Sequence, residues 1–228
     1  MIIVAAGQGH RYGGLKQFEL LAGRPVHEWS VAAAREAADG VVLVVPPGLV
    51  DDRALAAGVD KVVAGGATRA ASVRAGLAAV PETARIVLVH DAVRPLASPS
   101  LFGAVVAALS PGGADGADGA DGAVPGLPLV DTVKQVEGRV VKATLDRERL
   151  VRVQTPQGFR AEWLRRAHSA GADATDDAAL VEALGGRVVV VPGEEGNLKI
   201  TSRADLAAAE ERLAARAPQG ERAKAPVT

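Results

Sequence analysis

The 228-residue sequence contains no cysteine, so neither a disulfide bond nor a metal site built on thiolates can form. Its four histidines are His10, His27, His90 and His168, and no two of them are four residues apart. Zinc sites draw on clustered cysteine, histidine or carboxylate ligands. The sequence therefore predicts no zinc site.

Aromatic residues make up only 3% of the chain, whereas hydrophobic residues as a whole make up 48%. The core must therefore be built from valine, leucine, isoleucine and alanine. A chain of this length fits one domain, or one domain with an appendage, and buries roughly 70% of the surface that its unfolded form exposes. We expect a single domain over residues 1–216, followed by a polar tail over residues 217–228.

The chain also has almost no net charge, since its formal net charge is −1 at pH 7. Binding to nucleic acids or to anionic membranes usually relies on a strong positive charge, so we expect neither kind of partner. No apolar run reaches the ~18 residues of a membrane span, and we recognise no signal peptide. These absences predict a cytoplasmic protein.

What the sequence does have is a glycine-rich segment directly after an apolar start. Residues 1–4 are typical of a buried strand, residues 5–14 form a glycine-rich loop that includes Arg11, and Lys16 follows. Glycines let backbone N–H groups approach an anion closely, and the two cations add side-chain donors. This order predicts a site for a polyphosphate, and the alternative is an ordinary tight turn after an edge strand.

Two well-known phosphate loops do not fit this segment. The dinucleotide pattern G-x-G-x-x-G needs a glycine where Tyr12 stands, which also argues against a Rossmann dehydrogenase. The P-loop pattern G-x-x-x-x-G-K-[ST], begun at Gly9, needs a lysine where Leu15 stands. The pattern that remains is A-A-G-x-G-x-R followed by L-K-Q.

The first half of the chain alternates between apolar, β-branched segments and amphipathic ones. The expected strands cover residues 1–4, 41–45, 61–63 and 85–90, and the expected helices cover residues 25–38, 51–57, 70–80 and 98–109. Strands that are apolar throughout are typical of a parallel sheet with helices on both faces. We therefore expect an α/β fold with a Rossmann-like, mostly parallel sheet. Ligands bind at the carboxyl ends of such strands, where the polar or glycine-rich breaks of this sequence lie.

The middle of the chain departs from this alternation. Residues 111–126 carry three Ala-Asp-Gly triplets whose spacing fits neither collagen nor a calcium loop, so we interpret them as a flexible surface insertion. Residues 127–152 predict a hairpin with strands at 129–136 and 139–141. A hairpin alone is only marginally stable in water, so this one should form a projecting arm that packs against something else.

The last third returns to short alternating elements. We expect a helix at residues 161–169, a strand at 187–191, an extended piece at 197–201 and a final helix to about residue 215. Ser202 and Asp205 have the spacing of a capping box at the start of that helix. Thr175 is expected to cap another helix, with Asp176 and Asp177 in its first turn beside the helix dipole.

Several short motifs also follow one another along the chain. They are A-A-G-x-G-x-R with Lys16-Gln17, Gly65-Gly66 with Arg69 and Ser72-Val73, His90-Asp91-Ala92-Val93-Arg94-Pro95, Asp131-Thr132-Val133-Lys134, Asp146-Arg147, Thr155-Pro156-Gln157, Thr175-Asp176-Asp177-Ala178, and Asn197-Leu198-Lys199-Ile200-Thr201. With this set, the chain resembles the 2-C-methyl-D-erythritol 4-phosphate cytidylyltransferase family over about residues 1–210. The resemblance implies a sheet of the nucleotide-diphospho-sugar transferase type. It also implies transfer of the cytidylyl group of CTP to a small polyol phosphate, with release of pyrophosphate.

The resemblance assigns roles to the matching positions. The residues implied to line the CTP site are Ala5, Ala6, Gly7, Gly9, Arg11, Lys16, Gly66, Ala67, Ser72 and Lys199. The residues implied to surround the acceptor phosphate are Asp91, Arg94, Thr132, Arg147 and Thr155, and Asp91 is also the implied Mg²⁺ ligand. Members of the family are homodimers in which the hairpin arm reaches the neighbouring active site. Thr132 and Arg147 would then act in trans.

The residue types suit this reaction. An acceptor phosphate oxygen attacks the α-phosphorus of CTP, and it is already anionic at neutral pH, so no general base is needed. Catalysis then consists of positioning and of stabilising negative charge. Arg11, Lys16, Lys199 and, from the arm, Arg147 are the expected catalytic cations, and Mg²⁺ would neutralise phosphate charge beside Asp91. His90 follows a buried strand and is expected to be a hydrogen-bonded core residue.

The sequence departs from the family pattern at a few positions. Ala67 stands where some members have an acidic residue, and Ala70 and Ala71 replace a more polar pair. Two alternatives remain open at this point. A ribitol 5-phosphate cytidylyltransferase would share the CTP half of the site. A non-catalytic nucleotide sensor would need the CTP residues but not the acceptor cations.

Overall fold

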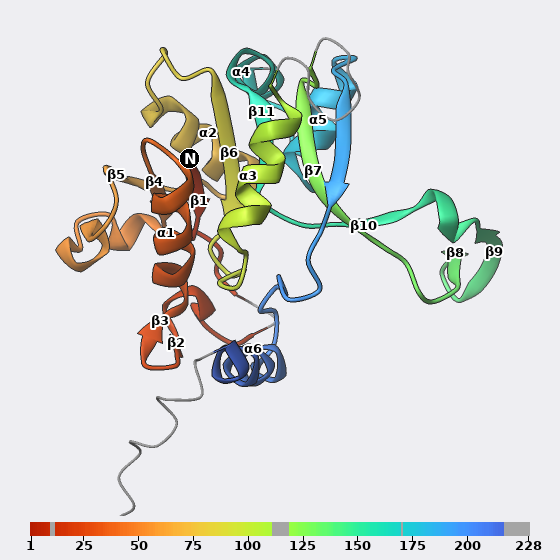
Figure 1. Ribbon diagram of the computed structural model, residues 1–228, viewed down its shortest axis with the longest axis horizontal. Coiled ribbons are helices and arrows are strands. Elements are labelled where there is room, and N and C mark those ends of the chain that lie inside the picture. Colours follow the sequence, from red (N-terminus) through yellow and green to blue (C-terminus); the bar gives the residue numbers. More distant parts are fainter. Residues whose placement is uncertain (10–11, 111–118, 170, 217–228) are drawn as a thin grey trace, which may run out of the picture.

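The fold is centred on an eight-stranded sheet, in the order β10-β7-β11-β6-β1-β4-β5 with β12 paired to β7 (Figure 1). The computed structural model describes residues 1–9, 12–110, 119–169 and 171–216. The strands of the sheet are β1 Ile2–Val4, β4 Val42–Val45, β5 Lys61–Ala64, β6 Ile86–Asp91, β7 Gly122–Pro128, β10 Val151–Val153, β11 Gln157–Arg160 and β12 Val188–Pro192. Strands β1, β4, β5 and β6 run parallel to one another, and β12 runs parallel to β7. Strand β10 pairs antiparallel with β7, and β11 pairs antiparallel with both β6 and β7. The predicted mostly parallel α/β sheet is confirmed.

Helices cover both faces of this sheet, namely α1 Val26–Ala37, α2 Arg69–Ala79, α3 Pro99–Ala108, α4 Ala161–Ser169 and α5 Asp177–Ala183. The last helix, α6 Arg203–Arg216, contributes Ala209 to a separate hydrophobic cluster. Ile2 and Ile3 are both fully buried although they point to opposite faces, because Ile2 packs with α2, α4 and α5 and Ile3 packs with α1. This two-sided burial explains why the strands are apolar throughout.

The short helix expected at residues 51–57 is present only as a 3₁₀ helix, Arg53–Ala56, so the prediction is wrong at both ends. Another 3₁₀ helix, Pro47–Leu49, precedes it, and the chain turns at Gly58 with a positive φ of 72°. So short a segment has no room for an α-helix to propagate. The extended piece expected at residues 197–201 forms neither helix nor turn and lies outside the sheets, and the N–H of its Ile200 donates to the carbonyl of Val93.

The insertion predicted at residues 111–126 is also wrong over its second half, and residues 111–118 lie outside the described part of the chain. Residues 122–126 belong to β7, where Ala123 and Val124 are buried. The glycines of this strand allow close packing. A Cβ on Gly126 would lie 2.6 Å from Val190 Cγ1, and one on Gly122 would lie 2.9 Å from the ring of Phe159. Tertiary packing therefore overrides the low strand propensity of glycine and proline.

The predicted arm is present as a separate two-stranded sheet, formed by β8 Val133–Glu137 and β9 Val140–Leu145. It projects from the side of the main sheet near β10 (Figure 1). Its first strand starts at Val133 where residue 129 was expected, and its second strand ends at Leu145 where residue 141 was expected. Residues 127–128 belong to β7. The arm leaves Val130, Val136, Val140 and Val141 more than half exposed, at 79%, 57%, 61% and 56%.

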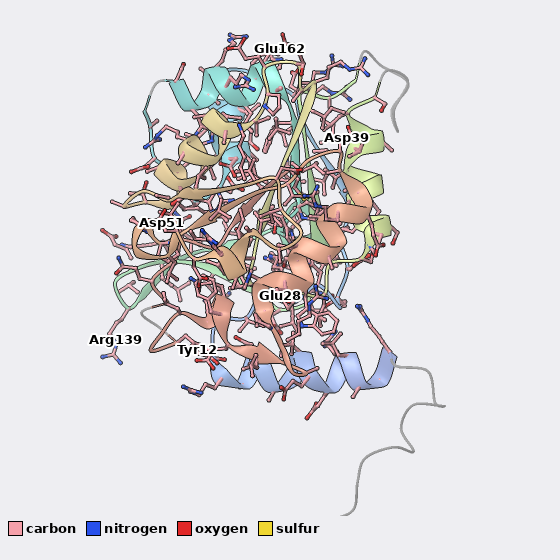
Figure 2. All side chains as sticks on the ribbon, turned by 90° about the vertical axis from the view of Figure 1, so that its left-hand side faces the viewer. Tyr12, Glu28, Asp39, Asp51, Arg139 and Glu162 are labelled. Atoms are coloured by element: carbon pink, nitrogen blue, oxygen red, sulfur yellow. The ribbon has the colours of Figure 1, made fainter. Side chains whose placement is uncertain are left out.

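The last helix, α6, is held beside the short hairpin of β2 Leu20–Leu21 and β3 Arg24–Pro25 (Figure 1). Tyr12 of the glycine-rich loop lies against this helix, with Arg203 5.2 Å from its ring centroid (Figure 2). The predicted capping box is confirmed, because the Ser202 N–H donates to Asp205 at 2.7 Å and the Asp205 N–H donates back to the Ser202 hydroxyl at 3.2 Å.

Replacing Asp205 with alanine should lower the free energy of unfolding by about 1 kcal/mol at pH 7, the usual cost of losing a cap. The hydroxyl and N–H of Thr201 and the N–H of Ser202 lower the pKa of Asp205 to about 2. Because this folded-state pKa lies below the unfolded one, the contribution is fully present above about pH 4 and is lost as the pH falls toward 2. Urea unfolding of both proteins should therefore show a difference that shrinks below pH 4. A difference that is the same at pH 7 and pH 2 would contradict this role.

Candidate active site

The glycine-rich loop after β1 is braced from inside the protein. Gly9 has a positive φ of 64°, and a Cβ there would lie 1.9 Å from the carbonyl oxygen of Gly14, so only glycine fits. The buried Gln17 side chain donates to the carbonyls of Ala5 at 2.7 Å and Gly7 at 2.9 Å. These contacts fix the described residues on either side of residues 10–11 at the carboxyl end of β1, as an anion site requires.

A second glycine pair, after β5, lies directly against this loop. A Cβ on Gly65 would lie 2.3 Å from the Cβ of Ala6, and one on Gly66 would lie 2.5 Å from the Cβ of Ala71. The hydroxyl of Ser72 accepts from the N–H of Gly66 at 3.2 Å and donates to the carbonyl of Thr68 at 2.9 Å. Ser72 is thus buried and holds this second loop from behind.

The charged centre of the site is Asp91, the last residue of β6. Its Oδ2 lies 2.7 Å from Lys199 Nζ and its Oδ1 lies 3.5 Å from Arg69 Nε. Burial by itself raises the pKa of Asp91, but the charges of Lys199 and Arg69 outweigh burial and hold that pKa well below its usual value. The carboxylate is therefore ionised throughout the physiological range.

Behind Asp91, the side chains of His90 and Thr155 are turned into the protein. The Thr155 hydroxyl accepts from the Asp91 N–H at 3.1 Å and lies 3.1 Å from His90 Nδ1, while His90 Nε2 lies 3.2 Å from the Arg94 carbonyl. Burial lowers the pKa of His90 to about 4, so the ring is neutral at pH 7. The prediction that His90 is a hydrogen-bonded core residue is confirmed.

Lys199 reaches Asp91 from a loop that is fixed by amide side chains. The fully buried Asn197 donates to the carbonyl of Thr155 at 2.9 Å, and Gln154 donates to the carbonyls of Glu194 at 2.8 Å and Asn197 at 3.2 Å. Arg94 Nη1 donates to the carbonyl of Asn197 at 2.9 Å. This network holds the backbone that carries Lys199, whose side chain is 40% exposed.

The structure brings most of the predicted site residues to one edge of the sheet. They lie at or next to the carboxyl ends of β1, β5 and β6, or in segments that contact these ends. The residues are Ala5, Ala6, Gly7, Gly9, Gly66, Ala67, Ser72, Asp91, Arg94, Thr155 and Lys199. Lys16 begins a short 3₁₀ helix, Lys16–Phe18, after the first loop. Arg11 lies outside the described residues.

Thr132 and Arg147 are not brought to this edge. Both are exposed on the arm, and Arg147 donates to the carbonyl of Val130 in the same arm. Arg139, labelled in Figure 2, lies at the turn between β8 and β9. Within the described part of one chain, these two side chains therefore contribute nothing to the site around Asp91.

The prediction that Thr175 caps a helix is wrong. The cap of α5 is Asp176, whose side chain accepts from the Ala179 N–H at 3.0 Å. Asp177 lies in the first turn of α5, as predicted, but its side chain is 1% exposed and its Oδ2 lies 2.8 Å from Arg69 Nη1. The local sequence pattern marked the helix start correctly to within a residue but gave no sign of this long-range ion pair.

Arg69 and Asp177 are thus residues of the site that the sequence did not single out. Arg69 was visible only as one letter of the motif after Gly65-Gly66, and Asp177 only as part of a capping pattern. An arginine that follows a glycine loop at a strand end, with an aspartate after the next strand, is a weak signal that could have suggested the Arg69–Asp91 contact. Nothing local could have suggested Asp177.

Comparisons with known proteins agree with this geometry. The sequence model of the family described as IspD, 2-C-methyl-D-erythritol 4-phosphate cytidylyltransferase, matches residues 1–215. A protein of that name from Streptomyces avermitilis is 46% identical over 235 residues, which cover 94% of this chain and 91% of that protein. The crystal structure of the same enzyme from Thermus thermophilus is similar, with 38% identity, a TM-score of 0.75 and coverage of 95% of this chain and 98% of that chain.

Some of the relatives are longer proteins. The bifunctional enzyme IspD/IspF of Nitratidesulfovibrio vulgaris is 44% identical over 228 residues, which cover 91% of this chain but only 56% of that enzyme. The chain therefore spans little more than half the length of this relative. In the part of the chain that the structure describes, no helix is both long and apolar enough to cross a membrane.

Proposed function

Because the chain belongs to the 2-C-methyl-D-erythritol 4-phosphate cytidylyltransferase family, we propose that it transfers the cytidylyl group of CTP to 2-C-methyl-D-erythritol 4-phosphate. The products are 4-diphosphocytidyl-2-C-methyl-D-erythritol and pyrophosphate, in the non-mevalonate isoprenoid pathway. The observation that carries this proposal is the Asp91–Lys199 pair, 2.7 Å apart, beside two tightly packed glycine loops. We also propose that the reaction takes place in the cytoplasm.

The proposed roles of the individual residues follow the family resemblance, and the geometry around Asp91 is compatible with them. The first glycine loop, with Lys16 and Arg11, holds the triphosphate, and the loop at Gly66 and Ala67 faces the cytosine with its backbone. Lys199, which contacts Asp91, and Arg94, which contacts the carbonyl of Asn197, are proposed to bind the acceptor phosphate. Bringing two anions together is the main obstacle, so fixed positive charge in a shaped site lowers the barrier.

Mg²⁺ is proposed to bind together with the nucleotide. Among the described residues, no three histidine, aspartate or glutamate side chains are grouped so as to hold a metal ion. Mg²⁺ commonly binds through one or two carboxylates together with substrate phosphates, so the single carboxylate of Asp91 fits an ion that arrives with the triphosphate. When bound, the ion neutralises phosphate charge.

The protein is also proposed to be a homodimer with composite sites. The arm carries exposed Thr132 and Arg147 and the four exposed valines, all of them on its surface. Arginine suits an acceptor phosphate because its planar fork binds phosphate through two hydrogen bonds. A second copy would cover the valines and receive Arg147 at its acceptor site.

Pyrophosphate release should test this function directly. Release is expected only when CTP, Mg²⁺ and 2-C-methyl-D-erythritol 4-phosphate are all present, because the acceptor attacks a metal-bound triphosphate. Ribitol 5-phosphate serves as the competing acceptor, and ATP, GTP and UTP serve as competing nucleotides. Equal turnover with UTP would contradict the cytidine assignment, and faster turnover with ribitol 5-phosphate would contradict the acceptor.

A further inference from the structure

A chain of buried charges leads from Asp91 into the interior of the protein. Arg69, the first residue of α2, contacts Asp91 Oδ1 through Nε at 3.5 Å and Asp177 Oδ2 through Nη1 at 2.8 Å. The other oxygen of Asp177 lies 3.0 Å from His168 Nε2. Asp177 and His168 are 1% and 2% exposed, so the far end of this chain of contacts is closed to water.

Asp177 is held in a single position. Besides its contacts to Arg69 and His168, its backbone N–H donates to Gln157 Oε1 at 3.2 Å, and Gln157 Nε2 donates to Asp176 at 3.1 Å. Both carboxylate oxygens and the backbone are therefore engaged. A carboxylate fixed in this way fixes in turn the guanidinium plane of Arg69, because that group is planar and its donors point in set directions.

Stability alone is a weak reason for such a pair. Buried ion pairs lose much of their attraction to the cost of removing both charges from water, and apolar replacements are often equally stable. The surroundings here are apolar, since Ala178 and Val181 of the same short helix belong to a large hydrophobic cluster. The charges of Arg69 and Asp177 are therefore better explained by what they do at Asp91.

Asp91 has one exposed partner and one partly buried partner. Lys199 is 40% exposed at its side chain and is the group proposed to engage phosphate, whereas Arg69 is 24% exposed and contacts Asp177 of α5. If Lys199 turned to a phosphate, Asp91 would still have Arg69 at Oδ1. We propose that Arg69 and Asp177 are positioning residues for the cytidylyl transfer proposed above, with Asp177 orienting Arg69 and Arg69 holding Asp91 in one orientation.

The test compares three variants with the wild type in the pyrophosphate assay, at saturating acceptor and varied CTP. Asp177→Asn and Arg69→Lys should each lower kcat about 10- to 100-fold, the scale of a small misplacement at a reacting centre, with KM for CTP nearly unchanged. Asp177→Asn should also lower the melting temperature, because it leaves Arg69 without its buried partner. The double variant Arg69→Met/Asp177→Asn removes both charges, so it should regain much of the melting temperature while kcat stays low.

Arg74→Gln is the matched control. Arg74 lies on the same helix and also faces an aspartate, Asp173, at 3.8 Å, but that pair is 31% and 55% exposed. Its kinetics should equal those of the wild type.

Three results would overturn the inference. One is a folded Asp177→Asn protein with wild-type kcat, and another is a double variant whose kcat recovers along with its melting temperature. The third is a rise in KM for CTP at unchanged kcat, because Arg69 would then serve the cytosine loop instead. A wild type that is inactive with CTP and both polyol phosphates would overturn the proposed function, and this inference with it.

Discussion

Replacing Lys199 with alanine should lower kcat roughly 100- to 1,000-fold, the loss expected when one preorganised charged donor is removed from a transition state. Lys199 Nζ lies 2.7 Å from Asp91. The loop that carries Lys199 is held in place by Asn197 and Gln154, so the positive charge of the lysine has a fixed position in the site. Because the charge is aimed at developing negative charge, the loss should appear mainly in kcat. Steady-state kinetics of pyrophosphate release would measure it.

Stability should change little in this variant. The side chains of Lys199 and Asp91 are 40% and 10% exposed, so the lysine is largely solvated whereas the carboxylate needs a partner. Asp91 also keeps Arg69 as a partner, so its carboxylate is not left alone. The melting temperature should therefore stay close to that of the wild type, which separates a catalytic loss from unfolding.

Lys61→Ala provides the matched control for Lys199. Lys61 is an exposed lysine at the amino end of β5, where its Nζ donates to the carbonyl of Ala79 at 3.2 Å, at the opposite edge of the sheet from Asp91. The Lys61→Ala substitution also removes one lysine charge, but it changes no residue of the site around Asp91. A Lys199→Ala enzyme with wild-type kcat, or a Lys61→Ala enzyme with an equal loss, would contradict a specific role for Lys199.

The parts of the fold that the sequence predicts well are those set by local periodicity. Apolar runs marked β1, β4, β5 and β6, and the spacing of Ser202 and Asp205 marked the start of α6. Each of these signals depends on neighbours within a few residues of one another. The glycine loops could be placed at the binding edge because the carboxyl ends of parallel strands meet there.

The parts that it predicts poorly depend on contacts between distant residues. Strand β7 is rich in glycine and proline, and only its packing against Phe159 and Val190 shows why small residues stand there. Asp177 has the local pattern of a first-turn residue, yet its partner Arg69 is 108 residues away. Such a pair produces no pattern in local residue spacing. The sequence therefore predicted which edge of the sheet carries the site, but not the Arg69–Asp177 pair that contacts Asp91.

The proposed trans arrangement of the arm makes the strongest prediction. If each active site takes Lys16 and Lys199 from one chain and Arg147 from the other, Lys16→Ala and Arg147→Ala dimers should each be nearly inactive. Mixed under conditions that exchange subunits, they form dimers in which one site carries both lesions and the other carries none. Statistical exchange makes about half of the dimers mixed, so activity should return to about one quarter of the wild-type value.

The control for this experiment is a mixture of Lys16→Ala with Lys199→Ala. Both lesions then lie on the same side of the composite site, so each site of the mixed dimer carries one of them and the activity should stay low. Arg147→Ala alone should raise KM for the polyol phosphate far more than KM for CTP, because arginine is proposed to bind only the acceptor. If native mass spectrometry shows mixed dimers of Lys16→Ala and Arg147→Ala while activity stays at the parental level, Arg147 acts within its own chain.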